Sequence, residues 1–368
     1  MPTPDPTSPN PAPPGPATAP CQAARRTLLG AISGLGGLGG LGVLGTAGGL
    51  AALPAGARAQ AAAFPQRPLT LLVPFAPGGI ADLTARALGQ GLAAELGQAV
   101  VVDNRPGAGS IHASQAVAQA APDGHTLLLM SNGHAVAPAL FRQLPYDAQR
   151  DFAPVCLLAR FDLALFVPAA SPLRSLADLL ARARAAPGRL TLGTVAAGST
   201  QHLAAHWLLQ RAGVDALVVP YKATPALLGA LRGGEVDAAI EILGPWLGQL
   251  APAGEGGAGL RALAVAAAQR HPYLPAVPTV AEAGGAALAG YDVSSWNALA
   301  APARTPAAVL ARLNQAANAA LARPAVQRQL RTLGVRLAGG SAEDLRRHLA
   351  AETARWAAVA RAAKIEAG

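Results

Sequence analysis

The stretch of residues 69–86 constrains the fold most, because a buried strand, a glycine turn and a helix follow one another in it. Leu69–Val73 is a short apolar run typical of a strand inside a parallel sheet. Pro74 ends this strand, and a helix with Asp82 in its first turn begins after the turn. The turn consists of Ala76, Pro77, Gly78 and Gly79. A strand that leads through glycines to a helix start is the usual ligand or anion corner of an α/β sheet, although any βα unit needs such a turn.

The composition indicates a large apolar core. Of the 368 residues, 52% are hydrophobic, 4% aromatic and 13% charged, and the length favours two lobes. The net charge of +9 is weak evidence for nucleic acid, because the arginines are scattered and no basic run alternates with aromatic residues. We therefore predict no nucleic-acid partner.

The N-terminal residues 1–59 predict an export signal rather than part of the fold. Residues 1–24 are rich in Pro, Ala and Thr and should be disordered. Arg25 and Arg26 precede a Gly/Leu/Ala stretch at residues 30–53, and small-x-small cleavage sites follow at 57–61, which is typical of a twin-arginine signal. A membrane anchor fits less well because glycines dilute the apolar segment. With no further membrane span expected, we predict a periplasmic or secreted protein.

Two more βα corners follow the first. Strands at residues 99–103 and 126–130 end in a Gly-rich loop at 104–110 and in a polar loop at 131–134 that contains Ser131 and Asn132. Parallel strands place all three corners at one edge of the sheet. The GAGSIH run is not a dinucleotide fingerprint, because His112 occupies the third Gly or Ala position and no acidic residue closes a ribose site. No cofactor is predicted.

A second α/β region follows a passage formed by residues 151–155 and 163–167. A helix at 175–186 and a strand at 190–194 lead to a loop at 196–202 that opens a helix at 202–212. The loop contains Gly198, Ser199, Thr200 and His202. Its free N–H groups and hydroxyls suit a carboxylate or phosphate, or alternatively the hydroxyls only cap the helix.

The next two strands each end in polar residues. The strand at 216–220 leads to Tyr221 and Lys222, and the strand at 236–241 ends in Glu241. Lys222 is equally explained as a solvated surface charge. His112, His134 and His202 show no metal-ligand spacing, so we predict no metal.

The remaining chain predicts a return to the first half. A strand at 260–266, a Pro-rich surface segment at 271–279 and a strand at 291–300 precede helices at 306–322, 324–333 and 342–364. Two crossings between halves give two α/β lobes joined by a double hinge, with a ligand cleft between them. We place lobe I at residues 60–165 and 287–368, and lobe II at 166–286.

A set of motifs in order along residues 64–368 closely resembles the Bug/TctC family, the extracytoplasmic solute-binding receptors of tripartite tricarboxylate transporters. The motifs include PFAPGGIADLTAR at 74–86, VVVDNRPGAGS at 100–110, GSTQHLAA at 198–205, VPYKATPALLGALRGGEVD at 219–237 and YDVSSWNALAAPARTP at 291–306. The resemblance implies a type II periplasmic-binding-protein, or Venus-flytrap, fold that closes on a small organic carboxylate. It also implies a cognate membrane transporter as a possible partner, and we expect a monomer.

The same resemblance assigns roles to individual residues. Residues 76–79 with Asp82 match the ligand loop of the first lobe, and Ser131 and Asn132 match its neighbour. Gly198, Ser199, Thr200 and His202 match the loop that holds a ligand carboxylate, and Tyr221 and Lys222 match a Tyr-Lys pair near the cleft. Ala76 stands where family members commonly have Pro, and Glu241 replaces an Asp-Asn-like exit. At the cleft edge Glu241 would repel a second carboxylate and meet an amine or hydroxyl instead.

Three functions were compared. A binding receptor needs no nucleophile or metal, and the sequence has no Gly-x-Ser-x-Gly, Gly-Lys-Ser/Thr or His-Glu-x-x-His motif. A hydrolase or isomerase would use Ser199 or Thr200 with His202 and Asp82, but Ser199 and His202 lie close together in one helix turn, where capping explains both. A co-inducer domain of a transcription regulator is contradicted by the export signal. The sequence thus predicts a receptor rather than an enzyme.

Overall fold

The computed structural model describes residues 64–107, 110–251 and 259–365. All of them lie in the larger of two compact units, residues 58–368. The predicted disordered segment and twin-arginine signal at residues 1–59 lie outside the described residues. Among the helices that are described, none combines the length and apolar composition that a membrane span requires.

The described strands form one connected sheet in the order β2-β1-β3-β9-β4-β7-β5-β6, and β8 and β10 each pair with β4. The strands are β1 (Leu69–Val73), β2 (Val100–Asn104), β3 (Thr126–Ser131), β4 (Phe152–Pro168), β5 (Thr191–Val195), β6 (Leu217–Tyr221), β7 (Ala238–Ile242), β8 (Leu260–Val265), β9 (Ser294–Pro302) and β10 (Arg336–Leu337). β1, β2 and β3 are parallel, and so are β5, β6 and β7. Parallel strands place the starts of the following helices at one edge.

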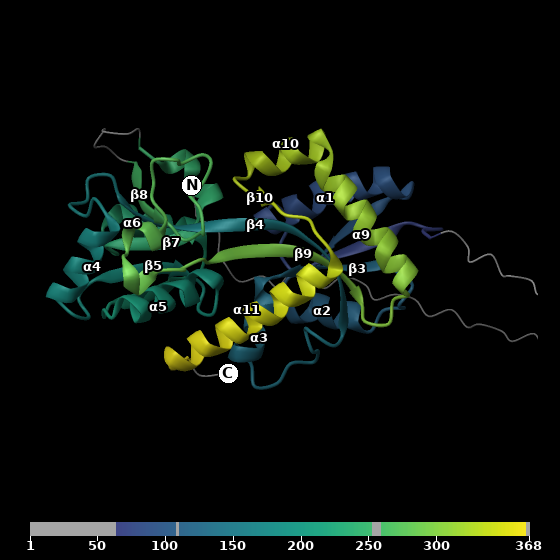
Figure 1. The fold of residues 1–368 in the computed structure, drawn as a ribbon, viewed down its shortest axis with the longest axis horizontal. Coiled ribbons are helices and arrows are strands. Elements are labelled where there is room, and N and C mark those ends of the chain that lie inside the picture. Colours follow the sequence, from purple (N-terminus) through teal and green to yellow (C-terminus); the bar gives the residue numbers. More distant parts are fainter. Residues whose placement is uncertain (1–63, 108–109, 252–258, 366–368) are drawn as a thin grey trace, which may run out of the picture. The chain divides into compact units, whose positions relative to one another are not determined.

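Strand β4 joins two parts of this sheet, and Figure 1 shows it beside β9. Its first part pairs antiparallel with β9 as far as Asp162 opposite Ser294, and from Leu163 onward it pairs with β7 and β8. We call β1, β2, β3, β9, β10 and the first part of β4 the first sheet, and the remaining strands the second sheet. The chain crosses between them in β4 and again between β8 and β9. The predicted limits of the lobes stay a prediction, and the one at 165/166 falls inside β4.

The helices fill the connections between strands. They are α1 (Ile80–Leu96), α2 (Ile111–Ala118), α3 (Asn132–Leu140), α4 (Leu176–Ala185), α5 (Thr200–Ala212), α6 (Thr224–Gly233), α7 (Leu243–Trp246), α8 (Val280–Ala283), α9 (Ala307–Ala322), α10 (Pro324–Thr332) and α11 (Ala342–Ala362). The helices α4 and α11 start with the expected chemistry, since Ser175 and Ser341 each cap the N–H three residues on.

Alternating side chains along the strands build two cores on the first sheet. Leu71 of β1 packs with α1, α9 and α10, and Leu72 faces the opposite way and packs with α2, α3 and α11. The second core continues onto the second sheet, where α4 and α5 cover one face. α6 and α7 cover its other face through a cluster that includes Phe166 and Trp246. α11 contacts both α3 and α5, so the last helix packs against elements that flank both sheets.

Three sequence predictions about local structure are wrong in part. The polar loop expected at residues 131–134 is a helix, because α3 begins at Asn132 directly after β3. The passage expected as two runs, 151–155 and 163–167, is the single strand β4. α5 begins at Thr200, two residues before the predicted start.

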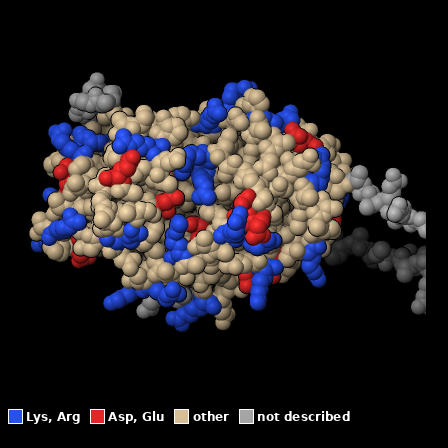
Figure 2. All heavy atoms as spheres, in the orientation of Figure 1, with Lys and Arg blue, Asp and Glu red and all other residues tan. Residues whose placement is uncertain are grey.

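Positive side chains are distributed over the face of the molecule that Figure 2 draws. On the face drawn in Figure 2, Lys and Arg are separated by residues of other kinds, with Asp and Glu among them. This distribution supports the interpretation of the net charge of +9 as scattered surface charge.

Candidate functional site

A cavity of about 530 Å³ opens at the helix starts that follow β1, β3 and β5. Much of its wall is apolar, and the larger apolar side chains are Phe75, Ile80, Val136, Leu140, Phe141, Phe161 and Ile242. The polar side chains on the wall are hydroxyls and amides, namely Ser110, Ser131, Ser199, Thr200, Gln201, Ser295 and Asn297. Among the residues that the structure describes, no charged side chain is part of this wall. A cavity of this size and polarity suits a small molecule with an apolar body.

Four helices of eight or more residues start at the cavity. Gly79, Ser110, Ser131 and Ser199 are the N-cap residues of α1, α2, α3 and α5, and all four line the wall. The first turn of a helix leaves backbone N–H groups without intrahelical partners, and the helix dipole adds positive partial charge there. Helix starts of this kind can hold an anion without a cationic side chain.

The loop that precedes α1 is held by Asp82. Its Oδ2 accepts hydrogen bonds from the Gly78 N–H at 2.9 Å and Arg86 Nε at 3.0 Å, and its Oδ1 accepts one from Asn104 Nδ2 at 3.0 Å. Burial alone would raise the pKa of Asp82, but the hydrogen bonds from Arg86, Gly78 and Asn104 outweigh it and lower the pKa. Asn104 also donates to the carbonyl of Phe75 at 3.0 Å, which places this aromatic residue at the cavity. Asp82 therefore holds the loop before α1 in its conformation.

His134 fixes the start of α3. Its Nδ1 accepts a hydrogen bond from the Ser131 N–H at 3.1 Å, and its Nε2 lies 2.8 Å from Ser114 Oγ. Because the Ser114 hydroxyl donates to the carbonyl of Ser110, Nε2 must carry the proton. Burial lowers the pKa of His134 to about 4, so the ring is neutral at pH 7. The neutral ring joins two of the helix starts that line the cavity.

The two hydroxyls at the start of α5 have different partners. Ser199 Oγ donates to the carbonyl of Val195 at 2.7 Å and accepts from the His202 N–H at 3.1 Å. Thr200 Oγ1 accepts from Asn132 Nδ2 at 2.6 Å. Ser199 thus donates its hydroxyl proton to an acceptor within the protein. His202 Nδ1 accepts from the Gly198 N–H at 3.3 Å and not from Ser199, so the pair lacks the hydrogen bond of an activated nucleophile.

The predicted site residues divide into two groups. Those on the cavity wall are Gly79, Ser131, Gly198, Ser199 and Thr200. Those not on the wall are Ala76, Pro77, Gly78, Asp82, Asn132, His202, Tyr221, Lys222 and Glu241. Of these, Ala76, Pro77 and Gly78 are exposed, as is Lys222, and Tyr221 is half-buried at the end of β6. Asn132, Asp82 and His202 are buried. Each is hydrogen-bonded to a residue of the cavity wall or adjacent to one in the sequence.

Glu241 lies behind the wall rather than at the cleft edge. It is 1% exposed, and its Oε1 accepts from Gln201 Nε2 at 2.6 Å and from the Ile242 N–H at 2.7 Å. Its Oε2 accepts from the Thr224 hydroxyl at 3.0 Å. Burial raises the pKa of Glu241 despite these three hydrogen bonds. Glu241 therefore orients Gln201, which is the residue that lines the cavity.

Sequence reasoning missed most of the apolar wall. Phe75, Ile80 and Gln201 fall inside the motifs that resemble the family. They could have been predicted if every side chain near the glycines of those motifs had been considered. Phe141 and Phe161 carry no such signal, because the fold alone brings them to the cavity. In the described ranges, no group of three or more His, Cys, Asp or Glu side chains could hold a metal ion.

A mixed α/β chain that crosses twice between two sheet parts, with an uncharged cavity at converging helix starts, has the architecture of a solute-binding receptor. Comparison with known proteins agrees. A family model described as the tripartite tricarboxylate transporter family receptor, TctC, matches residues 84–365. The chain belongs to this family, whose members are solute-binding receptors and not enzymes.

Individual relatives support this assignment along the chain. The UPF0065 protein in the tcbD-tcbE intergenic region of Pseudomonas sp. (strain P51) is 42% identical over 294 residues, which cover 80% of this chain and 85% of that protein. The structure of R. palustris Rpa4515 with adipate is 37% identical, with a TM-score of 0.70, and the match covers 83% of this chain and 100% of that one. MatC (Rpa3494) from Rhodopseudomonas palustris with bound malate is 33% identical, with a TM-score of 0.66, over 80% of this chain and 99% of that one. The predicted α/β binding-protein fold is thereby confirmed.

Proposed function

We propose that this protein captures a small organic carboxylate in the cavity at the starts of α1, α2, α3 and α5. The convergence of four helix starts on a wall without charged side chains carries the proposal. Preorganised N–H groups stabilise an anion and leave no buried cation unpaired when the ligand departs. Rpa4515 with adipate and MatC with malate support the ligand class.

The apolar wall narrows the class to acids with a hydrocarbon body. Phe75, Phe141 and Phe161 offer ring surfaces, and Val136 and Leu140 offer aliphatic ones. Each buried CH₂ of a ligand contributes about 0.8 kcal/mol of transfer free energy. An acid such as adipate, hexanoate or benzoate therefore fits this wall better than the more polar malate does.

We further propose that the protein works in the periplasm, reached through the twin-arginine route, and that it acts as a monomer for a tripartite tricarboxylate-type transporter or for sensing. Membership of the receptor family and the paired arginines Arg25 and Arg26 support this. A receptor of this kind needs only to bind, close and release.

A thermal-shift screen tests the ligand class. Adipate, hexanoate, benzoate and malate are compared with the neutral amide hexanamide, because a ligand that binds only the folded state raises the melting temperature. We expect the first three acids to raise it more than malate does, and hexanamide to leave it unchanged. If no acid raises the melting temperature, or if hexanamide matches hexanoate, the proposal is wrong.

A further inference from the structure

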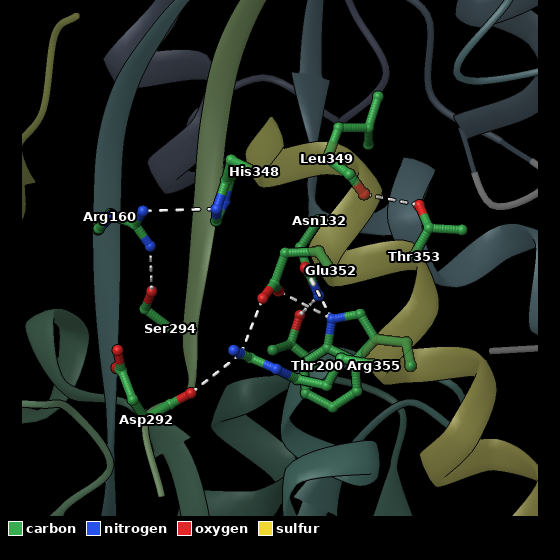
Figure 3. A network of polar contacts seen from close by, with 11 residues as sticks. Asn132, Arg160, Thr200, Asp292, Ser294, His348, Leu349, Glu352, Thr353 and Arg355 are labelled. Atoms are coloured by element: carbon green, nitrogen blue, oxygen red, sulfur yellow. Dashed lines mark hydrogen bonds and ion pairs between the residues drawn. The ribbon is translucent and has the colours of Figure 1, made fainter. Parts of the chain in front are cut away.

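Trp356 of the last helix, α11, is hydrogen-bonded to a residue that touches the cavity wall. Its indole Nε1 lies 3.2 Å from Asn132 Oδ1 and 3.0 Å from Glu352 Oε2. Asn132, Glu352 and Trp356 are all buried, with at most 4% of each residue exposed. Figure 3 shows Glu352, Asn132 and Thr200 gathered beside α11. The last helix therefore reaches the ligand site through one amide side chain.

The polarity of this contact fixes the orientation of Asn132. The single indole N–H is shared between Glu352 Oε2 and Asn132 Oδ1, and because it can only donate, the Asn132 carbonyl oxygen faces Trp356. The amide nitrogen then faces the other way, where Asn132 Nδ2 lies 2.6 Å from Thr200 Oγ1. The direction of the Asn132–Thr200 hydrogen bond is therefore set by Trp356.

That direction decides what Thr200 offers to the cavity. Because Thr200 Oγ1 accepts from Asn132, its own hydroxyl proton is free to donate, and the described residues give it no acceptor. Thr200 is part of the cavity wall, in the first turn of α5. An anionic ligand is the acceptor that this proton lacks.

We propose that Trp356 is a positioning residue for ligand binding, which orients Asn132 so that the Thr200 hydroxyl donates to the ligand carboxylate. This inference rests on the proposed function. The chain of hydrogen bonds is called the Trp356 relay below, and it consists of Trp356, Asn132 and Thr200. Glu352 holds the indole in place and is itself paired with Arg355 at 2.8 Å, while Arg355 donates to the carbonyl of Asp292 at 3.0 Å.

Trp356→Phe tests the relay, because it keeps an aromatic ring and removes the N–H. Dissociation constants for adipate, hexanoate and benzoate are measured separately by calorimetry on the full chain. We expect binding to weaken about tenfold, since hydrogen bonds to charged groups contribute most among hydrogen bonds. Trp246→Phe is the matched control, because Trp246 is equally buried but its Nε1 has no partner among the described residues. It should change these constants less than twofold.

A double-mutant cycle separates positioning from a general effect on packing. If Trp356 acts through Thr200, then Trp356→Phe weakens binding in the wild-type background and has less than a twofold effect in the Thr200→Val background. Equal losses in both backgrounds would overturn the relay, and so would equal losses from Trp356→Phe and Trp246→Phe.

A second variant covers the case in which Trp356→Phe does not fold. Asn132→Leu keeps a similar volume and cannot donate to Thr200, so it should weaken binding about tenfold in the wild-type background and less than twofold with Thr200→Val. An unchanged affinity in Asn132→Leu would overturn the relay while the proposed function stands. If the wild-type protein binds none of the three acids, the proposed function fails and the relay fails with it.

Discussion

The Arg336 guanidinium donates two hydrogen bonds to one oxygen of Asp162, from Nε at 3.0 Å and from Nη2 at 2.7 Å. Asp162 is the last residue of β4 that pairs with β9, so this ion pair lies where β4 leaves the first sheet. Asp162 is 1% exposed, and its Oδ2 has no partner among the described residues. Burial raises the pKa of Asp162, and the charge and hydrogen bonds of Arg336 oppose that rise.

Replacing Arg336 should destabilise the protein in a pH-dependent way. Arg336→Met leaves a buried carboxylate without its cation, which typically costs about 3–5 kcal/mol of unfolding free energy at pH 7. A carboxyl whose folded pKa is raised stabilises the fold below its unfolded pKa and loses that contribution as the pH rises. The difference between variant and wild type in urea unfolding should therefore be smaller at pH 4 than at pH 7. An equal difference at both pH values would show that Arg336 acts only through packing.

The buried His134 should make stability fall on acidification. Its pKa is lowered by burial to about 4, below the ordinary value of 6.5, so between these pH values the unfolded chain binds a proton that the folded chain does not. The unfolding free energy should decrease by about 1.4 kcal/mol for each pH unit from this group alone. His134→Gln should show a shallower dependence in urea unfolding between pH 6.5 and 4. A slope in His134→Gln equal to that of the wild type would contradict this account of His134.

Ser199 and Thr200 should respond differently to loss of their hydroxyls. Ser199 caps α5 through the His202 N–H, so Ser199→Ala should lower the unfolding free energy by about 1 kcal/mol. Thr200→Val should also lower stability, by about 1–3 kcal/mol, because the buried Asn132 Nδ2 loses its acceptor, and unlike Ser199→Ala it should weaken adipate binding. Urea unfolding and calorimetry on the two variants check this. A weaker effect of Thr200→Val than of Ser199→Ala on adipate affinity would contradict it.

Glu241→Gln should stabilise the protein at neutral pH. Burial raises the pKa of Glu241, so the ionised form becomes a growing cost as the pH rises from 4.5 toward the folded pKa. A glutamine keeps an acceptor for Gln201 and the Ile242 N–H and carries no charge. The unfolding free energy of the variant should exceed that of wild type by up to about 1.4 kcal/mol for each pH unit in that interval. A variant less stable than wild type at pH 7 would show that the ionised carboxylate itself is required.

The regular elements could be predicted because local signals were strong. β1 and the glycine turn before α1 follow directly from an apolar run and residues 76–79, and Ser175 marks the start of α4 as expected. α3 was missed because Gly133 and Pro138 disfavour a helix locally, whereas packing of Val136 in the core stabilises it. Tertiary packing outweighed propensity at this position.

Residues whose role depends on partners distant in the sequence could not be predicted. Asp162 is a charged residue inside the buried strand β4, and its partner Arg336 lies 174 residues later in the sequence. Phe161 reaches the cavity and Trp356 reaches Asn132 through the fold, and no spacing in the sequence indicates either contact. The glycine and hydroxyl loops were visible because they are local, and the apolar wall was not.

Backbone N–H groups at the four helix starts have a consequence for how this receptor can diversify. A point substitution changes a side chain and leaves the amide donors in place, so the proposed binding of an acid group by these donors is insulated from most mutations. The rings and aliphatic groups of the same wall, such as Phe161 and Val136, have no such protection. New ligand preferences can therefore arise by single substitutions on that wall, while the proposed affinity for acid groups is retained.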